Sequence, residues 1–241
     1  MKNIDLISFA TADELAQAVA SAWLDEIEAA NRAGKTHCVA LSGGRIARKF
    51  FAAVAKRTKT CAVSFGHVHF FWADERCVPP ADPESNFYLA KELLFGPLKI
   101  GDAQIHRIHG EDSPAAAAKA ASTEISKIVP LNEAGQPVLD IIFLGMGEEG
   151  HVASLFTGES NVLILDKVIY RAVKNSPKPP PNRVTLGYTT IAVAKQVWVL
   201  VSGTGKEPTL RESLCSKSRT ALARVTQFRT RTKIFCDFPL S

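Results

Sequence analysis

Cysteine is sparse in this sequence, and no two cysteines stand at the spacing of a metal-binding or redox pair. The five are scattered, at Cys38, Cys61, Cys77, Cys215 and Cys236. The absence of any CxxC pair excludes a zinc ribbon and a thioredoxin-like motif. The low cysteine density also argues against a disulfide-rich secreted scaffold, so we expect a protein of a reducing, cytoplasmic environment.

Long apolar runs are missing as well. Runs such as Val197–Val201 fall far short of the roughly 20 residues that a transmembrane helix needs. The first ten residues hold one lysine within a short strand-like segment, rather than a charged stretch followed by a long apolar one. We therefore expect no signal peptide, no membrane partner and a soluble protein.

The composition is not extreme in any direction. The hydrophobic fraction is 46% and the charged fraction 22%, which excludes a disordered tail, a collagen-like fibre and a coiled coil. No linker or repeat divides the chain, and Pro177–Pro181 is too short to separate domains, so we expect one domain over residues 1–241. The net charge of +5 suits nucleic acid, a membrane surface or a small anionic substrate without choosing among them.

Helix-like and strand-like apolar spacing alternate along the chain. A capping box at residues 11–14 predicts a helix that ends near Gly34, and further helices are expected at about 46–56, 85–94, 114–128 and 206–214. Strands are expected at 38–41, 68–72, 139–144, 196–202 and 233–235, with strand segments near 168–173 and 183–186. Strands that alternate with helices predict an α/β fold in which a mainly parallel sheet is covered on both faces.

Four of the predicted strands lead into loops rich in glycine or charge. These loops are Ser42–Gly44, Asp74–Arg76, Gly145–His151 and Gly203–Lys206. Ligands of open parallel sheets bind beyond the carboxyl ends of the strands. If the four strands are parallel, the loops therefore share one rim and form one site.

Two of these loops contain glycine patterns that suggest anion binding. Ser42, Gly43 and Gly44 lie between a strand and a helix, where backbone N–H groups and the helix N-terminus favour an anion, and Arg45 adds a charge. The alternative is a tight turn that needs glycine only for its dihedral angles. Residues 145–150 match GxGxxG, but the segment that follows is too short for a crossover helix and Glu148 and Glu149 would repel pyrophosphate. A nicotinamide cofactor is therefore not expected.

His151 directly follows these glycines and is a candidate general base. A nearby carboxylate, either Glu149 or Asp74, could orient its ring, although a lone histidine can equally be a surface or capping residue. His67 and His69 share one strand face without a third ligand at suitable spacing, and the remaining histidines show no partner pattern. We therefore expect no metal.

Cations at the same rim could hold a phosphate. Arg76, Arg183 and Lys206 are the candidates. Residues 206–233 are also basic, with eight Lys or Arg against two Glu, but no aromatic residues are interleaved to stack on bases. We interpret that segment as a solvated surface and expect no nucleic-acid partner.

An ordered set of motifs resembles the 6-phosphogluconolactonase family over most of the chain. The set comprises residues 41–44, 72–80, 83–86, 145–156, 176–185 and 203–206. Gly145–Phe156, which reads GMGEEGHVASLF, is the most specific of them.

The resemblance implies hydrolysis of 6-phospho-D-glucono-1,5-lactone to 6-phosphogluconate, the second step of the pentose phosphate pathway. It also implies a three-layer α/β/α, modified Rossmann-like fold shared with sugar-phosphate isomerases and glucosamine-6-phosphate deaminases, with no cofactor or metal. Carried over by position, His151 is the general base, and Asp74 and Arg76 line the sugar ring and phosphate. The expected anion clamp comprises Ser42, Gly43, Gly44, Arg183 and Lys206.

The sequence departs from the family pattern at two places. Glu149 stands where the family usually has Asp. The longer side chain can orient His151 only if the distance between the Glu149 backbone and the imidazole is readjusted. Arg45-Ile46-Ala47 replaces Ser-Thr-Pro, which removes a hydroxyl contact that Arg45 could replace.

Two other functions are considered beside lactone hydrolysis. A glucosamine-6-phosphate deaminase would carry a catalytic Glu five residues after the histidine, where this chain has Phe156. A non-catalytic sugar-phosphate sensor would keep the pocket without the chemistry. The absence of a GxSxG motif argues against a covalent acyl-enzyme. We expect a monomer or a weak homodimer.

Overall fold

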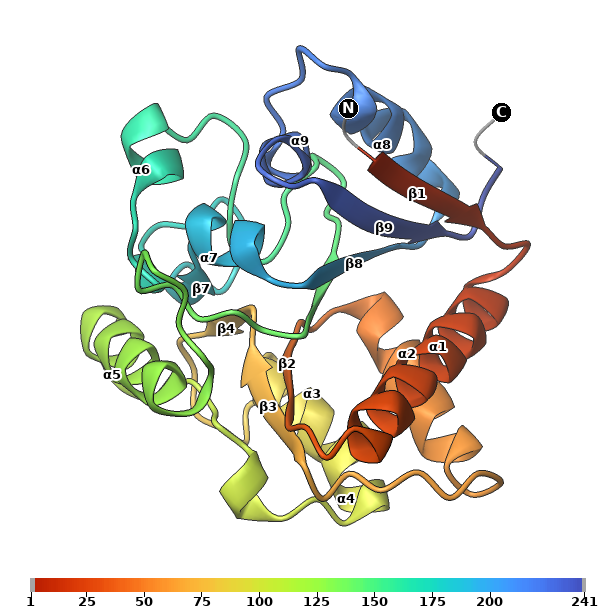
Figure 1. The fold of residues 1–241 in the computed structure, drawn as a ribbon. Coiled ribbons are helices and arrows are strands. Elements are labelled where there is room, and N and C mark those ends of the chain that lie inside the picture. Colours follow the sequence, from red (N-terminus) through yellow and green to blue (C-terminus); the bar gives the residue numbers. More distant parts are fainter. Residues whose placement is uncertain (1–2, 240–241) are drawn as a thin grey trace.

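A six-stranded parallel sheet forms the centre of the molecule (Figure 1). The computed structural model describes residues 3–239, so Met1, Lys2, Leu240 and Ser241, which the single-domain prediction includes, lie outside the described residues. The sheet order is β1-β9-β8-β5-β2-β3, and every neighbouring pair is parallel. The strands are β1 (Asn3–Ser8), β2 (His37–Leu41), β3 (Val68–Trp72), β5 (Ile141–Gly145), β8 (Gln196–Val201) and β9 (Arg231–Cys236).

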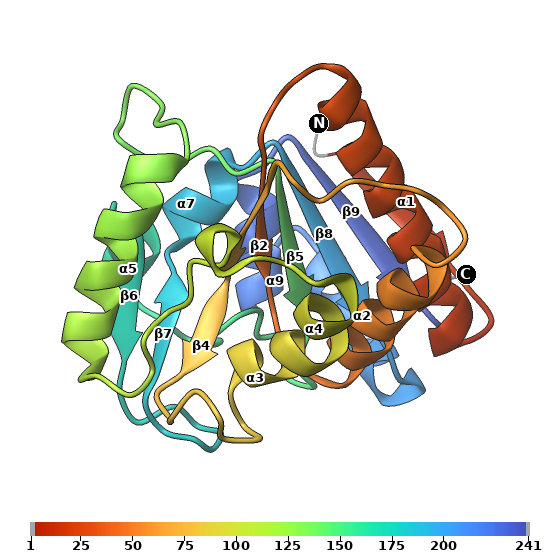
Figure 2. The same cartoon turned by 90° about the horizontal axis from the view of Figure 1, so that it is seen from below.

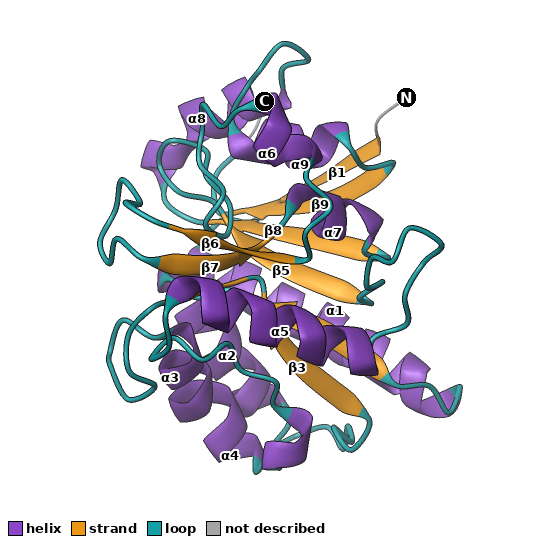
Figure 3. Ribbon diagram, turned by 90° about the vertical axis from the view of Figure 1, so that its left-hand side faces the viewer, coloured by secondary structure: helices purple, strands orange, loops and turns teal. Residues whose placement is uncertain are grey.

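Helices cover both faces of this sheet, as the sequence predicts (Figures 1 and 3). On one side lie α1 (Ala12–Arg32) and α2 (Arg45–Arg57), and on the other lie α7 (Tyr188–Val193), α8 (Glu207–Leu214) and α9 (Ala221–Gln227). The predicted capping box starts α1: the Glu14 N–H donates to the Thr11 hydroxyl, and the Ala10 N–H donates to the Glu14 carboxylate. The three-layer α/β/α fold is confirmed.

A second, antiparallel sheet corrects part of the prediction. Its strand order is β4 (Asp74–Arg76), β7 (Arg183–Leu186) and β6 (Tyr170–Val173), and α5 (Pro114–Ile128) packs beside it (Figure 2). The segment predicted as a charged loop is therefore a short strand. The chain passes between the sheets at Ala73, whose N–H donates to Leu41 while its carbonyl accepts from Leu186.

Shorter segments complete the fold. The predicted helix at 85–94 is α3 (Asn86–Ala90), which continues as a π-helical turn over Lys91–Phe95 and then α4 (Gly96–Leu98). The remaining turns are α6 (Asn161–Leu165) and two 3₁₀ turns, Asp102–Gln104 and Thr204–Lys206. The helices α7 and α9 are not predicted from the sequence. No helix within residues 3–239 has the length and hydropathy needed to cross a membrane.

The apolar core lies between the parallel sheet and its helices. Trp23 of α1 meets Phe143 of β5 edge-on, with ring centroids 5.3 Å apart, and Phe143 in turn meets Trp198 of β8. Trp23 and Trp198 are fully buried. Burial of large aromatic rings against the central strands contributes strongly to stability, and it holds the strand ends in a rigid frame.

The strands β8, β5, β2 and β3 are consecutive neighbours in the sheet, and all four end at the same edge. The connection after β2 runs through α2 on one face, whereas α7 on the other face precedes β8. From β2 the chain continues to β3 on one side, and from β5 it continues to β8 on the other side, so the direction of strand addition reverses between β2 and β5. Such a switch point leaves a crevice beyond the strand ends, where ligands of open α/β sheets bind.

Candidate active site

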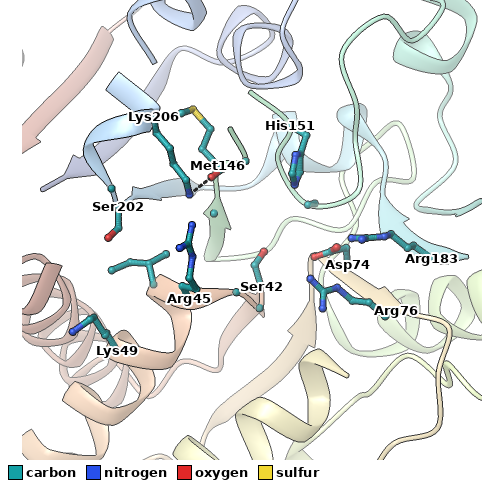
Figure 4. Close-up of a pocket in the computed structure, with 17 residues that line it drawn as sticks. Ser42, Arg45, Lys49, Asp74, Arg76, Met146, His151, Arg183, Ser202 and Lys206 are labelled. Carbon is teal, nitrogen blue, oxygen red and sulfur yellow. Dashed lines mark hydrogen bonds between the residues drawn. The ribbon is translucent and has the colours of Figure 1, made fainter. Parts of the chain in front are cut away.

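A cavity of about 310 Å³ opens at this edge of the sheet (Figure 4). Nine of the ten predicted site residues line it: Ser42, Gly43, Gly44, Arg45, Asp74, Arg76, His151, Arg183 and Lys206. Glu149, the tenth, is not part of the lining and contacts His151 instead. The four strand-end loops therefore converge on one cavity, whose volume suits a small ligand.

One end of the cavity, which we call the anion end, is formed by Ser42–Arg45 and Lys206. Gly44 is the N-cap of α2 with a φ of 98°, a backbone conformation that favours glycine, and no side chain caps the first turn. The N-terminus of this 13-residue helix therefore faces the cavity with its N–H groups available for an anion. The Ser42 hydroxyl donates to the Phe143 carbonyl at 2.8 Å, so toward a ligand it can only accept.

Two cations of the anion end extend into the cavity in Figure 4. The Lys206 ammonium donates to the Met146 carbonyl at 2.5 Å, and burial, followed by the nearby Arg45 charge, lowers the pKa of Lys206. Arg45 is exposed and forms no ion pair or side-chain hydrogen bond with residues 3–239. A bound anion would relieve the repulsion between these two cations.

Sequence reasoning missed other residues at this end. Lys49 lines the cavity, although its ammonium is held by Asp13 at 2.6 Å. Asp237 accepts from the Ser202 hydroxyl at 2.6 Å and from the Gly203 N–H at 2.8 Å, and so holds the loop that carries Lys206. No local pattern marks Asp237, because it reaches this loop from 35 residues further along the chain.

The other end of the cavity, which we call the base end, is lined by Asp74, Arg76, His151 and Arg183, and we include Glu149 in it because Glu149 contacts His151. The His151 Nδ1 atom lies 2.8 Å from Glu149 Oε1, and the Lys178 ammonium lies 2.7 Å from Glu149 Oε2. Sequence reasoning missed Lys178. Gly147 leaves space for the imidazole, since a Cβ built there would lie 1.9 Å from the ring.

The surroundings of His151 suit a general base. Burial lowers the pKa of His151, and the Glu149 carboxylate offsets only part of that shift. Partial burial acts to raise the pKa of Glu149, but the hydrogen bond from Lys178 and the contact with His151 contribute to a net downward shift. An ionised carboxylate only accepts, so the neutral imidazole carries its proton on Nδ1 and leaves the Nε2 lone pair free.

Asp74 and Glu75 are adjacent carboxylates with different surroundings. Asp74 lines the cavity and accepts from the Ser154 hydroxyl at 2.7 Å. Glu75 points away and accepts from the backbone N–H groups of Arg76, Asn86 and Phe87. Burial raises the pKa of Glu75 to about 7 against the lowering effect of these donors. Within the predicted charged trio, therefore, the cavity is lined by Asp74 and Arg76, and Glu75 holds the N-terminus of α3.

The two arginines of the base end are already engaged by the protein. Arg183 donates through Nε to the Pro180 carbonyl and through Nη2 to the carbonyls of Lys178 and Pro179, at 2.9 to 3.1 Å. Arg76 donates through Nη1 to the Glu84 carbonyl at 2.8 Å. Both guanidinium groups line the cavity, as Figure 4 shows, but most of the Arg183 donors bind main-chain carbonyls.

His106, which shows no partner pattern in the sequence, has two partners in the structure. His106 Nε2 lies 2.8 Å from His69 Nδ1, and its Nδ1 lies 3.3 Å from the Glu124 carboxylate. These residues come from β3, the segment after it and α5, so their approach is tertiary and leaves no spacing signal. Within residues 3–239, no three histidine, cysteine or carboxylate side chains are grouped so that they could hold a metal ion.

Comparison with known proteins places this geometry in context. The family model described as glucosamine-6-phosphate isomerases/6-phosphogluconolactonase matches residues 10–234. A curated 6-phosphogluconolactonase from Streptomyces coelicolor is 33% identical, with 80% of this chain and 76% of that protein covered. One from Treponema pallidum is 35% identical, with 82% and 80% covered.

Solved structures agree with the same fold. The crystal structure of a devB protein superposes with a TM-score of 0.87 at 30% identity, covering 97% of this chain and 96% of the other. The 6-phosphogluconolactonase from Trypanosoma brucei superposes with a TM-score of 0.84 at 25% identity, covering 98% and 97%. A monomeric glucosamine-6-phosphate deaminase, at 20% identity and a TM-score of 0.79, shares the fold.

Proposed function

The chain belongs to the family of glucosamine-6-phosphate isomerases and 6-phosphogluconolactonases. We propose that it is an enzyme of the pentose phosphate pathway that hydrolyses 6-phospho-D-glucono-1,5-lactone to 6-phospho-D-gluconate. The observation that carries the proposal is the pairing of His151 with Glu149 at one end of a cavity whose other end is cationic. Curated relatives with this activity, each about one-third identical, support it.

In the proposed reaction, His151 acts as the general base. Its Nε2 takes a proton from water while the water oxygen attacks the lactone carbonyl carbon, and the bond from that carbon to the ring oxygen then breaks. The ring oxygen receives a proton and becomes the hydroxyl of the open-chain acid. Asp74 lines the cavity beside this base and would contact the ring hydroxyls. A lactone is a reactive ester, so one base and well-placed charges suffice.

We propose that the two ends of the cavity divide the substrate between them. Ser42, Gly43, Gly44, Arg45 and Lys206 would bind the phosphate, because helix N-terminal N–H groups and cations favour a dianion there. Arg76 and Arg183, which the sequence assigns to the phosphate, line the base end instead, and we propose that they face the reacting carbonyl, where a fixed positive charge would stabilise the developing oxyanion. We propose no cofactor and no metal for this reaction.

A deaminase function is disfavoured by one position. Phe156 occupies the place of the catalytic Glu in the deaminase pattern, and its ring lies against His151 with centroids 5.2 Å apart. An apolar ring cannot exchange protons with the substrate, so the protein keeps the base without the second acid–base group of that chemistry. We therefore rank isomerisation or deamination of glucosamine 6-phosphate below lactone hydrolysis, as the second candidate function.

We further propose that one domain over residues 1–241 works in the cytoplasm as a monomer or weak homodimer, with a sugar-phosphate lactone as its ligand and no nucleic-acid partner. The size of the cavity and its excess of cations support a small anionic ligand.

Hydrolysis of freshly generated 6-phosphogluconolactone tests the proposed function. The wild-type protein is expected to exceed the spontaneous rate, and His151→Ala is expected to fall by about 10²–10⁴-fold, the usual contribution of a general base. Equal rates for both proteins at the spontaneous background would favour the sensor. Release of ammonia from glucosamine 6-phosphate by the wild-type protein would instead favour the deaminase.

A further inference from the structure

The Glu149 carboxylate makes two contacts, one through each oxygen. Oε1 lies 2.8 Å from His151 Nδ1, and Oε2 lies 2.7 Å from the Lys178 ammonium. Lys178 is not among the residues that line the cavity. We propose that Lys178 is a positioning residue that acts through Glu149 to hold the His151 imidazole in the orientation and tautomer of a base; its effect on catalysis rests on the proposed function.

Glu149 needs such a second contact because it is partly exposed. Its side chain is 38% accessible, and one more methylene than Asp gives the carboxylate an additional rotatable bond. His151 and Lys178 are the two side chains within residues 3–239 that bind this carboxylate. Without the ammonium, the carboxylate would exchange between His151 and water, and the imidazole would lose its preference for the Nδ1 proton.

The main chain around Lys178 is held in place. Arg183 donates to the carbonyls of Lys178, Pro179 and Pro180, and the Ser176 N–H donates to the Pro181 carbonyl at 2.8 Å. Proline restricts φ at the positions on either side of Lys178. The lysine therefore presents its side chain from a fixed backbone, which reduces the entropy lost when the ion pair forms.

The charged groups that face His151 come from three segments. Glu149 lies on the same loop, Lys178 lies between β6 and β7, and Asp74 lies on β4. The carboxylate of Asp74 accepts from the Ser154 hydroxyl, whereas the partner of His151 Nδ1 is Glu149. Because the Lys178–Glu149 pair is partly exposed, its effect should be moderate, well below that of removing the base itself.

The direct test is the tautomer of His151 in the free protein. Nitrogen-15 NMR of the imidazoles distinguishes a protonated ring nitrogen from an unprotonated one, and a His151→Gln spectrum assigns the signals. The wild-type protein is expected to show the Nδ1–H tautomer at a pH where His151 is neutral. Lys178→Met should shift the population toward Nε2–H and lower kcat by about tenfold with KM unchanged within about twofold.

Matched variants separate positioning from a general loss of structure. Lys178→Arg keeps the cation and its donors and should restore the Nδ1–H tautomer and most of kcat. Lys174→Met, an exposed lysine four residues earlier in the same loop, should change neither quantity. In a Glu149→Asp background the shorter carboxylate cannot span both partners, so Lys178→Met should have little further effect on the tautomer.

An unchanged tautomer in Lys178→Met would overturn the proposal, as would an equal effect of Lys174→Met or failure of Lys178→Arg to restore the signal. The NMR readout needs no substrate. If the wild-type protein does not hydrolyse the lactone, the proposed function fails while the tautomer experiment still tests the role of Lys178.

Discussion

The two ends of the cavity are built on opposite principles. At the anion end, main-chain N–H groups and two cations face the space: Arg45 is exposed and forms no side-chain hydrogen bond within residues 3–239, and Lys206 makes one hydrogen bond, to the carbonyl of Met146. At the base end, each charged side chain is held by another part of the protein, as in the contacts of His151 with Glu149 and of Arg183 with three carbonyls. The difference indicates that adaptable cations bind charge, whereas a reacting group needs a preorganised frame.

The largest effect that would test this contrast is expected at Glu149. His151 and Lys178 contact different oxygens of Glu149, and in Glu149→Gln one of these oxygens becomes an NH₂ group, so the remaining amide oxygen should face the ammonium. The amide NH₂ then faces Nδ1, which must accept, so the imidazole proton moves to Nε2 and the base is lost. We expect kcat to fall by about 10²-fold with KM changed by less than about threefold.

Steady-state kinetics with the spontaneous hydrolysis subtracted measures this prediction, and His151→Gln supplies the floor of activity. If Glu149→Gln keeps kcat within about threefold of the wild type, the base end does not depend on this carboxylate and the contrast between the ends is wrong.

At the anion end the same measurement should give the opposite pattern. Lys206→Met removes one cation of the proposed phosphate site. A charged hydrogen bond contributes about 1.5–3 kcal/mol, so KM should rise by about 10–100-fold with kcat nearly unchanged. Lys49→Met is the matched control, because Lys49 lines the same end but its ammonium is held by Asp13. A fall in kcat without a rise in KM would place Lys206 with the reacting groups instead.

The features that the sequence predicts are those that depend on local pattern. The apolar strands that lead to Ser42, Asp74, Gly145 and Ser202 are continuous in sequence, and parallel strands bring their ends to one edge. This is why eight of the ten expected residues line one cavity, whereas Arg183 reaches it from β7 of the second sheet. The shared fold follows from the same alternation of strands and helices.

What the sequence does not predict depends on tertiary approach. Lys178, Asp237 and the His69–His106 pair reach their partners from distant segments, and no spacing rule marks them. The strand β4 was missed because Asp-Glu-Arg has no apolar alternation, and it pairs with β7 only after the chain has left the parallel sheet at Ala73. The sequence indicates that Arg183 is a cation suited to phosphate. It cannot reveal that the guanidinium donates to three main-chain carbonyls of the folded chain.

The pH dependence of kcat tests the base end of the cavity with a smaller effect than the substitutions above. His151 must be neutral to act as a base, and burial lowers its pKa below the ordinary 6.5. Activity should therefore persist through pH 6.5 and decline only as the pH falls through that lower pKa. We propose to measure kcat, which reports the ionisation of His151 in the substrate complex, because the titration of the substrate phosphate near pH 6 also affects kcat/KM. A midpoint above 6.5 would contradict a buried, neutral His151.

The smallest expected effect on activity concerns Glu75, which stands beside Asp74 but faces away from the cavity. Its pKa in the folded protein is raised from 4.5 to about 7, chiefly by burial, so the folded state binds the proton more tightly than the unfolded state between these values. Stability relative to a non-titrating variant must therefore fall as pH rises through this window.

Glu75→Gln removes the titration, so the difference in free energy of unfolding should move in favour of the variant by about 2 kcal/mol between about pH 5 and pH 8. Denaturant titrations of both proteins at the two pH values measure this difference, and kcat and KM should stay within about twofold. Parallel pH dependence in the two proteins would show that Glu75 does not titrate in this range, whereas a large fall in kcat would show that the base end extends behind the cavity wall to the N-terminus of α3.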